Sequence, residues 1–282
     1  MSDTLHTLTD TPVNCNLEIA KNNILVPGRI LNKLRLGAFQ RNTRFGNCHR
    51  RVHTKYLGMT SETNKPFTLS KSSTIEDFEA ANKASTDQLK VSKPEILEIS
   101  GKGQSPHTLW IGCSDSRVNE CTVLGCVPGE IFTVRNIGNV VTTGDLACIS
   151  AIQFAIESLK VKRVVVCGHT DCGGMWGALS SNKANGPLDN WLLPVRNVRL
   201  EHLDELDAIT DGPQKNAKLS ELNVLHSVEV VRRHPSFVKA HRESGVEVYG
   251  LLYDVKTGYL KQVSSAGEAA RKIEEVFDLG GK

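Results

Sequence analysis

Two features that would place a protein in or across a membrane are missing from this sequence. No apolar run approaches the roughly 20 residues that a helix needs to cross a bilayer. No apolar segment follows Met1 in the way that one follows the start of a secretory signal peptide. We therefore expect a soluble chain without a membrane span.

A strong excess of charge of one sign is also missing. The net charge is only +3 over 282 residues, and charged residues make up 23% of the chain. This balance gives no general argument for a nucleic-acid partner, and we expect none. A hydrophobic content of 39% is typical of a globular fold.

The chain lacks both a disulfide framework and a redox dithiol motif. It has 8 cysteines, but they are spread over a long chain and no two form Cys-x-x-Cys. Cys148 and Cys167 lie in apolar stretches, which is typical of core thiols. Because this use of cysteine indicates a reducing compartment, we predict that the protein is cytoplasmic.

Acidic residues are absent from residues 19–61, where arginine and lysine are frequent. We interpret residues 1–60 as a basic, disordered N-terminal extension. The alternative is a mitochondrial transit peptide, since such peptides are poor in acid and rich in arginine. Residues 1–18 contain no lysine or arginine, which favours the first interpretation.

From Phe67 onward the sequence has the pattern of a globular domain. The capping box Ser73-Thr74-Ile75-Glu76 predicts a helix that ends near Lys90, and residues 91–106 look like a loop. Strands are predicted over 108–111, 131–135, 163–167, 246–253 and 259–263. Helices are predicted over 118–124, 145–159, 188–199 and 219–233, and a further helix is expected to begin at Gly173-Gly174. This alternation predicts an α/β fold with a central, mostly parallel β-sheet flanked by helices. We assign residues 67–265 to this domain and residues 266–282 to a C-terminal tail.

Two short motifs follow two of the predicted strands. Cys-Ser-Asp-Ser-Arg at 113–117 comes after the first strand, and Gly-His-Thr-Asp-Cys-Gly-Gly at 168–174 follows the strand over 163–167. The ends of parallel strands meet at one edge of a sheet, so the two motifs should lie close together. Cys113, His169 and Cys172 would then offer two sulfurs and one nitrogen, a set that suits Zn²⁺ with a fourth position left over.

Other metal and redox chemistry fits these residues less well. A nucleobase deaminase would need a glutamate two residues after its histidine and a Pro-Cys-x-x-Cys, and neither is present at His169 or Cys172. Asp115 and Arg117 are open to two interpretations. The first is a surface ion pair of little energetic value. The second is a carboxylate close to the metal, which either binds the metal and closes the site or is kept off it by a bidentate arginine.

Taken together, these motifs resemble the β-class carbonic anhydrases, fungal members most closely. Gly103-Gln104-Ser105-Pro106, Pro128-Gly129-Glu130 and Arg135-Asn136-Ile137 fit the family as well. The resemblance extends from about Phe67 to about Val263 and implies a β-carbonic-anhydrase-like fold.

The resemblance also implies roles for particular residues. It implies a zinc-binding catalytic domain with one Zn²⁺ per chain on Cys113, His169 and Cys172, and Asp115 and Arg117 as a catalytic gating pair. Substrate-binding residues would be Gln104, Phe132, Ile137, Phe154, Gly173 and Gly174, with CO2 in an apolar pocket and Gln104 donating to bicarbonate. The implied assembly is a homodimer or a dimer of dimers, in which the partner chain supplies Gln104 and some aromatic residues.

The implied activity is the reversible hydration of CO2 to bicarbonate and a proton, by attack of zinc-bound hydroxide on CO2. Two other functions fit the same motifs: hydrolysis of a CO2-like molecule such as CS2 or COS, and a catalytically silent zinc-stabilised binding module. A structural zinc would need none of Gln104, Asp115 and Arg117, which argues against the silent module.

Overall fold

The computed structural model describes residues 67–182, 184–264 and 276–277. The chain divides into two units, Met1–Lys65 and Pro66–Lys282. The extension predicted over residues 1–60 and most of the tail predicted over 266–282 lie outside the described residues. The elements below all belong to the second unit.

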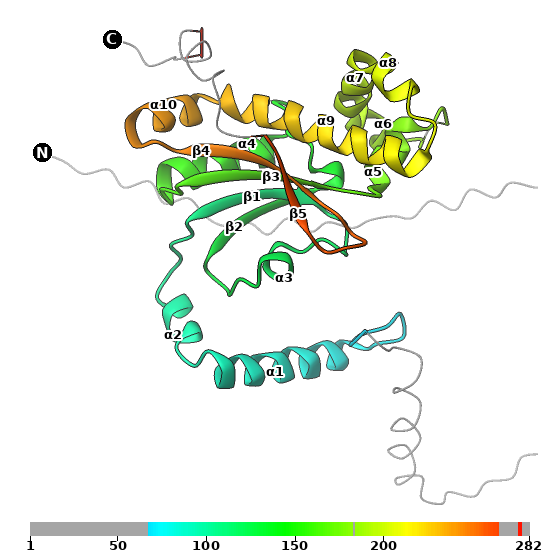
Figure 1. Ribbon diagram of the computed structural model, residues 1–282. Coiled ribbons are helices and arrows are strands. Elements are labelled where there is room, and N and C mark those ends of the chain that lie inside the picture. Colours follow the sequence, from blue (N-terminus) through cyan, green and yellow to red (C-terminus); the bar gives the residue numbers. More distant parts are fainter. Residues whose placement is uncertain (1–66, 183, 265–275, 278–282) are drawn as a thin grey trace, which may run out of the picture. The chain divides into compact units, whose positions relative to one another are not determined.

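A five-stranded sheet forms the centre of this unit, in the order β2-β1-β3-β4-β5 (Figure 1). Its strands are β1 Thr108–Cys113, β2 Ile131–Asn136, β3 Arg163–His169, β4 Glu247–Tyr253 and β5 Leu260–Ser264. Strands β1 to β4 pair in parallel, and β5 runs antiparallel to β4. β1 is buried throughout and β3 almost throughout, because both are central strands.

Helices occupy most of the remaining described chain. They are α1 Ile75–Ser92, α2 Ile96–Gly101, α3 Glu120–Leu124, α4 Leu146–Gln153, α5 Gly173–Leu179, α6 Pro187–Trp191, α7 Leu193–Glu201, α8 Leu203–Asp207, α9 Gly212–Arg232 and α10 Pro235–Ser244. A 3-10 turn, η1 Ile137–Asn139, follows β2, and a π-helical turn, η2 Phe154–Ser158, follows α4. The predicted α/β fold with a mostly parallel sheet is confirmed.

Two apolar clusters hold the helices against the sheet. In the first, Ile152 of α4, Val228 of α9 and Phe237 of α10 pack with strand residues such as Ile111 and Val166. The second contains residues of α5, α7 and α9, and it includes Cys113 and Cys172. Helices α5 to α8 gather at the end of the sheet to which β3 points (Figure 1). The two predicted sulfur ligands therefore lie inside a packed cluster at that end.

Several helix boundaries differ from those predicted. The helix expected over 219–233 begins at Gly212, because Asp211 accepts a hydrogen bond from the Gln214 N–H at 2.8 Å and a proline sits in the first turn. Residues 214–218 are mostly polar, so no apolar pattern indicated this start. The helix expected over 188–199 is split at Leu192 into α6 and α7.

Three helices, α2, α8 and α10, were not predicted at all. α2 lies within the stretch interpreted as a loop over 91–106. His234-Pro235 ends α9 as expected but also begins α10, where the His234 side chain caps the helix and Pro235 occupies its first turn. The capping box of α1 consists of Thr74 and Asp77, one residue later than predicted.

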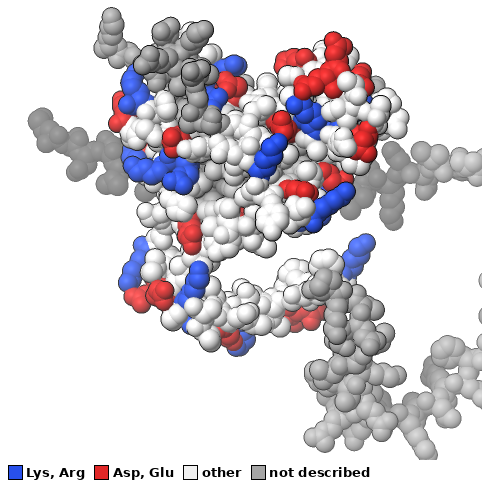
Figure 2. Space-filling view, in the orientation of Figure 1, with Lys and Arg blue, Asp and Glu red and all other residues white. Residues whose placement is uncertain are grey.

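The described surface carries charges of both signs. On the face shown in Figure 2, basic and acidic side chains are interspersed rather than gathered into one basic surface. Among the described residues, no helix is both long enough and apolar enough to cross a membrane.

Candidate metal centre

Three donor side chains meet at the carboxyl ends of β1 and β3. Cys113 is the last residue of β1, and His169 is the last residue of β3. These strands are neighbours in the sheet, with Gly112 opposite Cys167. Cys172 lies in the turn that follows β3, directly before α5. Two apolar runs that fold into adjacent parallel strands thus bring the two motifs together, as predicted.

The spacing of the donor atoms suits a single metal ion. The Sγ atoms of Cys113 and Cys172 are 4.0 Å apart, and these sulfurs and a ring nitrogen of His169 all lie within 4.8 Å of one another. Two sulfurs bound to one tetrahedral Zn²⁺ at about 2.3 Å each would be roughly 3.8 Å apart. All three side chains are buried.

The imidazole of His169 is oriented as a metal ligand would be. Its Nδ1 atom is 2.9 Å from the carbonyl oxygen of Thr170, whereas its Nε2 atom is buried without a hydrogen-bond partner. If Nδ1 carries the proton and donates it to this carbonyl, Nε2 keeps a free lone pair. A buried nitrogen without a partner destabilises a fold, so its lone pair indicates a missing ligand such as a metal ion.

The two thiols favour ionisation of one sulfur. A hydrogen bond from the Cys172 thiol lowers the pKa of the Cys113 thiol well below its usual range. The backbone N–H of Gly138, 3.3 Å from the Cys113 sulfur, acts in the same direction. The same pairing, together with burial, raises the pKa of Cys172. A divalent cation between the two sulfurs would allow both to ionise.

Asp115 is held beside the donor set by Arg117. The Nε and Nη2 atoms of Arg117 donate to the two carboxylate oxygens at 3.0 and 2.8 Å, and Nη1 donates to Asp171 at 3.0 Å. Hydrogen bonding to this guanidinium lowers the pKa of Asp115 to about 2, so the carboxylate is ionised at neutral pH. The Oδ2 atom of Asp115 is 3.9 Å from Nε2 of His169. Arg117 thus forms a bidentate clamp on Asp115, and the gating role of the pair stays a prediction.

Three of the predicted substrate residues, Ile137, Gly173 and Gly174, also lie near the donor set. Ile137 and Gly138 form the turn η1, and the Gly138 N–H faces the Cys113 sulfur. A Cβ atom on Gly174 would lie 3.3 Å from the Gly138 Cα and 3.4 Å from the Ile137 side chain. Gly174 therefore permits close packing of this turn. A Cβ on Gly173 would meet nothing within 4 Å, so packing gives no reason for a glycine there.

The other predicted substrate residues lie elsewhere in the same chain. Gln104 comes before the amino end of β1, whereas Cys113 is at the carboxyl end of this strand. Phe132 is in register with Leu109, and its ring packs on that of Phe154 with centroids 5.8 Å apart. At about 3.3 Å per residue, Leu109 is roughly 13 Å from Cys113 along β1. One chain alone does not bring these three side chains to the donor set.

Comparison with known families identifies the protein that carries this site. A family model described as carbonic anhydrase matches residues 108–260, which is more than half of the chain. The chain belongs to the carbonic anhydrase family. Its activity is that of a carbonic anhydrase, an enzyme that interconverts CO2 and bicarbonate.

Individual relatives place the enzyme among the fungal β-class members. A carbonic anhydrase of Candida albicans is 46% identical over 230 residues, covering 81% of this chain and 82% of the relative. One from Saccharomyces cerevisiae is 37% identical over 212 residues, covering 73% and 96%. A solved β-carbonic anhydrase of Aspergillus fumigatus matches with a TM-score of 0.69 and 40% identity, covering 73% of this chain and 99% of that one. The tetrameric β-carbonic anhydrases of Sordaria macrospora give 0.67 and 39%, with 69% and 98% covered.

Several contacts that support the donor set were not predicted from the sequence. Arg117 also donates to the backbone carbonyl of Asp171 at 3.0 Å, and Arg135 donates to the carbonyls of Cys113 and Asp115 at 2.9 and 2.6 Å. Asn216 contacts the backbone of Cys172 from α9. The available signal was a row of polar residues at helical spacing in α9. This row begins with Asn216.

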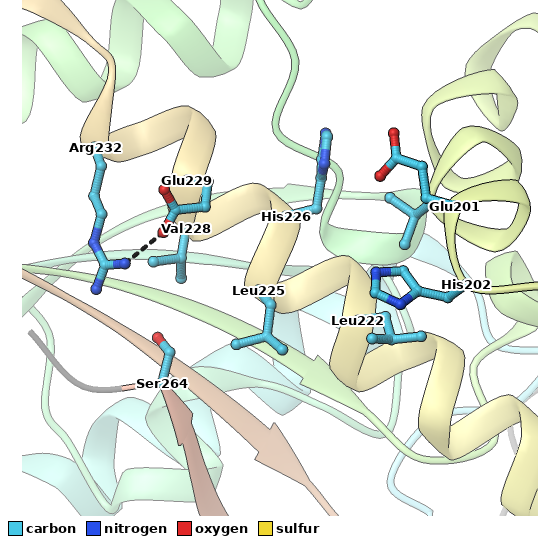
Figure 3. Close-up of a pocket in the computed structure, with 10 residues that line it drawn as sticks. Glu201, His202, Leu222, Leu225, His226, Val228, Glu229, Arg232 and Ser264 are labelled. Carbon is cyan, nitrogen blue, oxygen red and sulfur yellow. Dashed lines mark hydrogen bonds and ion pairs between the residues drawn. The ribbon is translucent and has the colours of Figure 1, made fainter. Parts of the chain in front are cut away.

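A separate pocket lies between α9, the end of α7 and Ser264 (Figure 3). Its volume is about 310 Å³, and none of its lining residues belongs to the donor set. Leu222 and Leu225 give it apolar walls, whereas Glu229 and Arg232 form an ion pair at its edge. The pocket therefore belongs to a different part of the enzyme from the metal centre.

Proposed function

We propose that this carbonic anhydrase hydrates CO2 with one Zn²⁺ ion per chain, held by Cys113, His169 and Cys172. The observation that carries this proposal is the buried donor set, in which Nε2 of His169 has no hydrogen-bond partner. Bound there, Zn²⁺ would act as a Lewis acid that lowers the pKa of a water molecule from 15.7 toward about 7 and so supplies hydroxide to attack CO2.

The thiolates set the electrostatics of the proposed site. Cys113 and Cys172 bring two negative charges, whereas three imidazoles would bring none. These charges offset the positive charge of a divalent ion, so the ion would lower the pKa of the water molecule by less. We therefore expect activity to rise as the pH increases from neutral to mildly alkaline values.

Asp115 and Arg117 would keep the fourth position open. Arg117 donates to both carboxylate oxygens. The carboxylate therefore stays close to the donor set but does not bind the metal ion. Held in this way, Asp115 can accept a hydrogen bond from the reacting water and orient its lone pair toward CO2. A zinc site with a purely structural role would not need this pair, which argues against a silent binding module.

We further propose that a second copy of the chain completes the substrate pocket. Gln104, Phe132 and Phe154 lie away from the donor set of their own chain, and Ile75 and Phe78 of α1 are largely exposed. A homodimer would cover such apolar side chains and would let Gln104 of one chain donate to bicarbonate in the other. The solved Sordaria macrospora relatives are tetrameric, which supports a dimer or a dimer of dimers.

Metal removal and replacement test the proposed function. The purified enzyme is assayed for CO2 hydration by stopped flow, with zinc measured on the same sample, before and after treatment with a chelator. We expect about one zinc per chain, loss of the rate with loss of zinc, and recovery on adding Zn²⁺ but not Mg²⁺. A full rate in zinc-free protein would refute the proposal, as would a zinc-loaded protein without activity, which would favour the silent module.

A further inference from the structure

Helix α9 carries a row of buried polar side chains on the face that packs against the rest of the fold. The row, here called the polar stripe, consists of Asn216, Ser220, Asn223 and Ser227, each at most 2% exposed. Spacings of four, three and four residues place all four on one side of the helix. Burying a polar group is unfavourable unless it is hydrogen-bonded. The groups that these side chains hydrogen-bond therefore indicate the role of the polar stripe.

Asn216 contacts both backbone polar groups of a proposed metal ligand. Its Oδ1 atom accepts a hydrogen bond from the Cys172 N–H at 3.0 Å, and its Nδ2 atom donates to the Cys172 carbonyl oxygen at 3.0 Å. Both contacts are buried, and the two residues are 44 positions apart in the chain. A two-point contact of this kind fixes the position of the backbone that carries the Cys172 sulfur.

Asn223 acts in the same way on the turn that faces the other sulfur. Its Nδ2 atom donates to the Gly138 carbonyl oxygen at 2.9 Å, while the Gly138 N–H donates to the Cys113 sulfur at 3.3 Å. Gly138 has a φ of 77°, a left-handed conformation that glycine adopts readily. Asn223 therefore holds in place the residue that stabilises negative charge on Cys113.

We propose that Asn216 and Asn223 are positioning residues for the two sulfur ligands. Through them a single helix fixes the backbone of Cys172 and the N–H donor to Cys113, although α9 contributes no ligand itself. This inference rests on the proposed zinc site. Removing a group that orients a metal ligand typically lowers metal affinity by about 10- to 100-fold. Loss of either amide should therefore loosen one sulfur and speed the release of zinc by a similar factor.

Ser220 provides a matched control within the same stripe. Its hydroxyl donates to the carbonyl oxygen of Asn216 at 3.0 Å, so the hydrogen bond stays within α9. Ser220→Ala removes a buried hydrogen bond from this face without removing a side-chain contact to either sulfur-bearing segment. If the amides served only to satisfy buried groups and stabilise the fold, Asn216→Ala and Ser220→Ala would behave alike.

The experiment compares full-length, zinc-loaded wild type with Asn216→Ala, Asn223→Ala and Ser220→Ala. The rate of zinc transfer to a colorimetric chelator is measured for each, with the melting temperature of the metal-free form as the measure of folding. The sulfur-to-metal charge-transfer bands of the cobalt-substituted forms are recorded as well. We expect fast zinc release and shifted bands for both asparagine variants, and release within about twofold of wild type with unshifted bands for Ser220→Ala.

Three results would overturn the inference. The first is an asparagine variant that releases zinc at the Ser220→Ala rate with wild-type bands. The second is faster release in all three variants in proportion to their loss of melting temperature. The third is wild type that holds no zinc, which refutes the metal proposal itself and is thereby distinguished from the other two. If Asn216→Ala does not fold, the comparison of Asn223→Ala with Ser220→Ala tests the inference alone.

Discussion

The carboxylate of Asp115 lies 3.9 Å from Nε2 of His169, at the edge of the proposed donor set. It is held there by the Nε and Nη2 atoms of Arg117. If this clamp were removed, the carboxylate would need to move only a short way to bind a metal ion. The arrangement makes Arg117 the residue that decides whether the fourth position is open.

Arg117→Ala should therefore close the site. We expect CO2 hydration at pH 7 to fall by about 100-fold while the zinc content stays normal, because Asp115 becomes a fourth ligand. Lysine at position 117 should rescue poorly, since a point charge cannot replace a bidentate clamp. Asp115→Ala should also lose activity but keep an open site, and the spectra of the cobalt forms should distinguish the two variants. Near-normal activity of Arg117→Ala at pH 7 would show that Asp115 and Arg117 form a simple ion pair without a gating role.

Much of this site could be predicted because its determinants are local in sequence. Cys113 and His169 each follow a continuous apolar run, and such runs become central parallel strands whose ends meet. The contact between Asn216 and Cys172 spans 44 residues, and the row of polar residues in α9 does not indicate which segment it contacts, so the contact became visible only in the folded chain. The start of α9 was missed for a similar reason, because a cap and a proline define it rather than apolar periodicity.

Mixed dimers should show that Gln104 serves the site of the partner chain. Gln104→Ala should lose roughly 10-fold in rate, the effect of one hydrogen bond to a charged group, and Cys172→Ser should be inactive. In a mixed dimer, the Gln104→Ala chain keeps an intact donor set and receives glutamine from the Cys172→Ser chain. Dimers that carry one differently tagged chain of each kind should therefore approach half the wild-type rate. A rate no higher than the average of the two parent variants would contradict a shared site.

Burial of Cys148 should make the enzyme less stable at alkaline pH. Burial raises the pKa of this thiol to about 12, above its unfolded value of about 9. Its contribution to the free energy of unfolding is therefore full below pH 9 and is lost as the pH rises from 9 toward 12. One such thiol lowers the free energy of unfolding by about 1.4 kcal/mol for each pH unit in that window.

Urea unfolding at several pH values between 9 and 11 tests this prediction. The slope of the free energy of unfolding against pH should be flatter by about 1.4 kcal/mol per unit in Cys148→Ala than in wild type. Cys121→Ala is the control. Because Cys121 is only half-buried, this substitution should change the slope of the free energy of unfolding against pH by less. Equal slopes for wild type and Cys148→Ala would show that the buried thiol does not titrate as expected.

Residues 1–60 should be dispensable for catalysis. A chain that begins at Met59 retains every residue assigned to the metal centre and the substrate pocket, so it should hydrate CO2 at a rate close to that of the full chain. A collapse of the rate with the fold and the dimer intact would show that the extension contributes to the site. We propose a cytoplasmic location, with mitochondria as the alternative, and imaging of full-length and shortened fluorescent fusions decides between them.

The most direct test of the account is to measure zinc content and CO2 hydration together in Cys172→Ser. Removing one of three donors should release most of the zinc and abolish the stopped-flow rate, because serine is a poor ligand for this ion. Cys121→Ser, which alters a half-buried thiol outside the donor set, should keep about one zinc per chain and the wild-type rate. Full retention of zinc and activity in Cys172→Ser would contradict the assignment of Cys113, His169 and Cys172 as the metal centre.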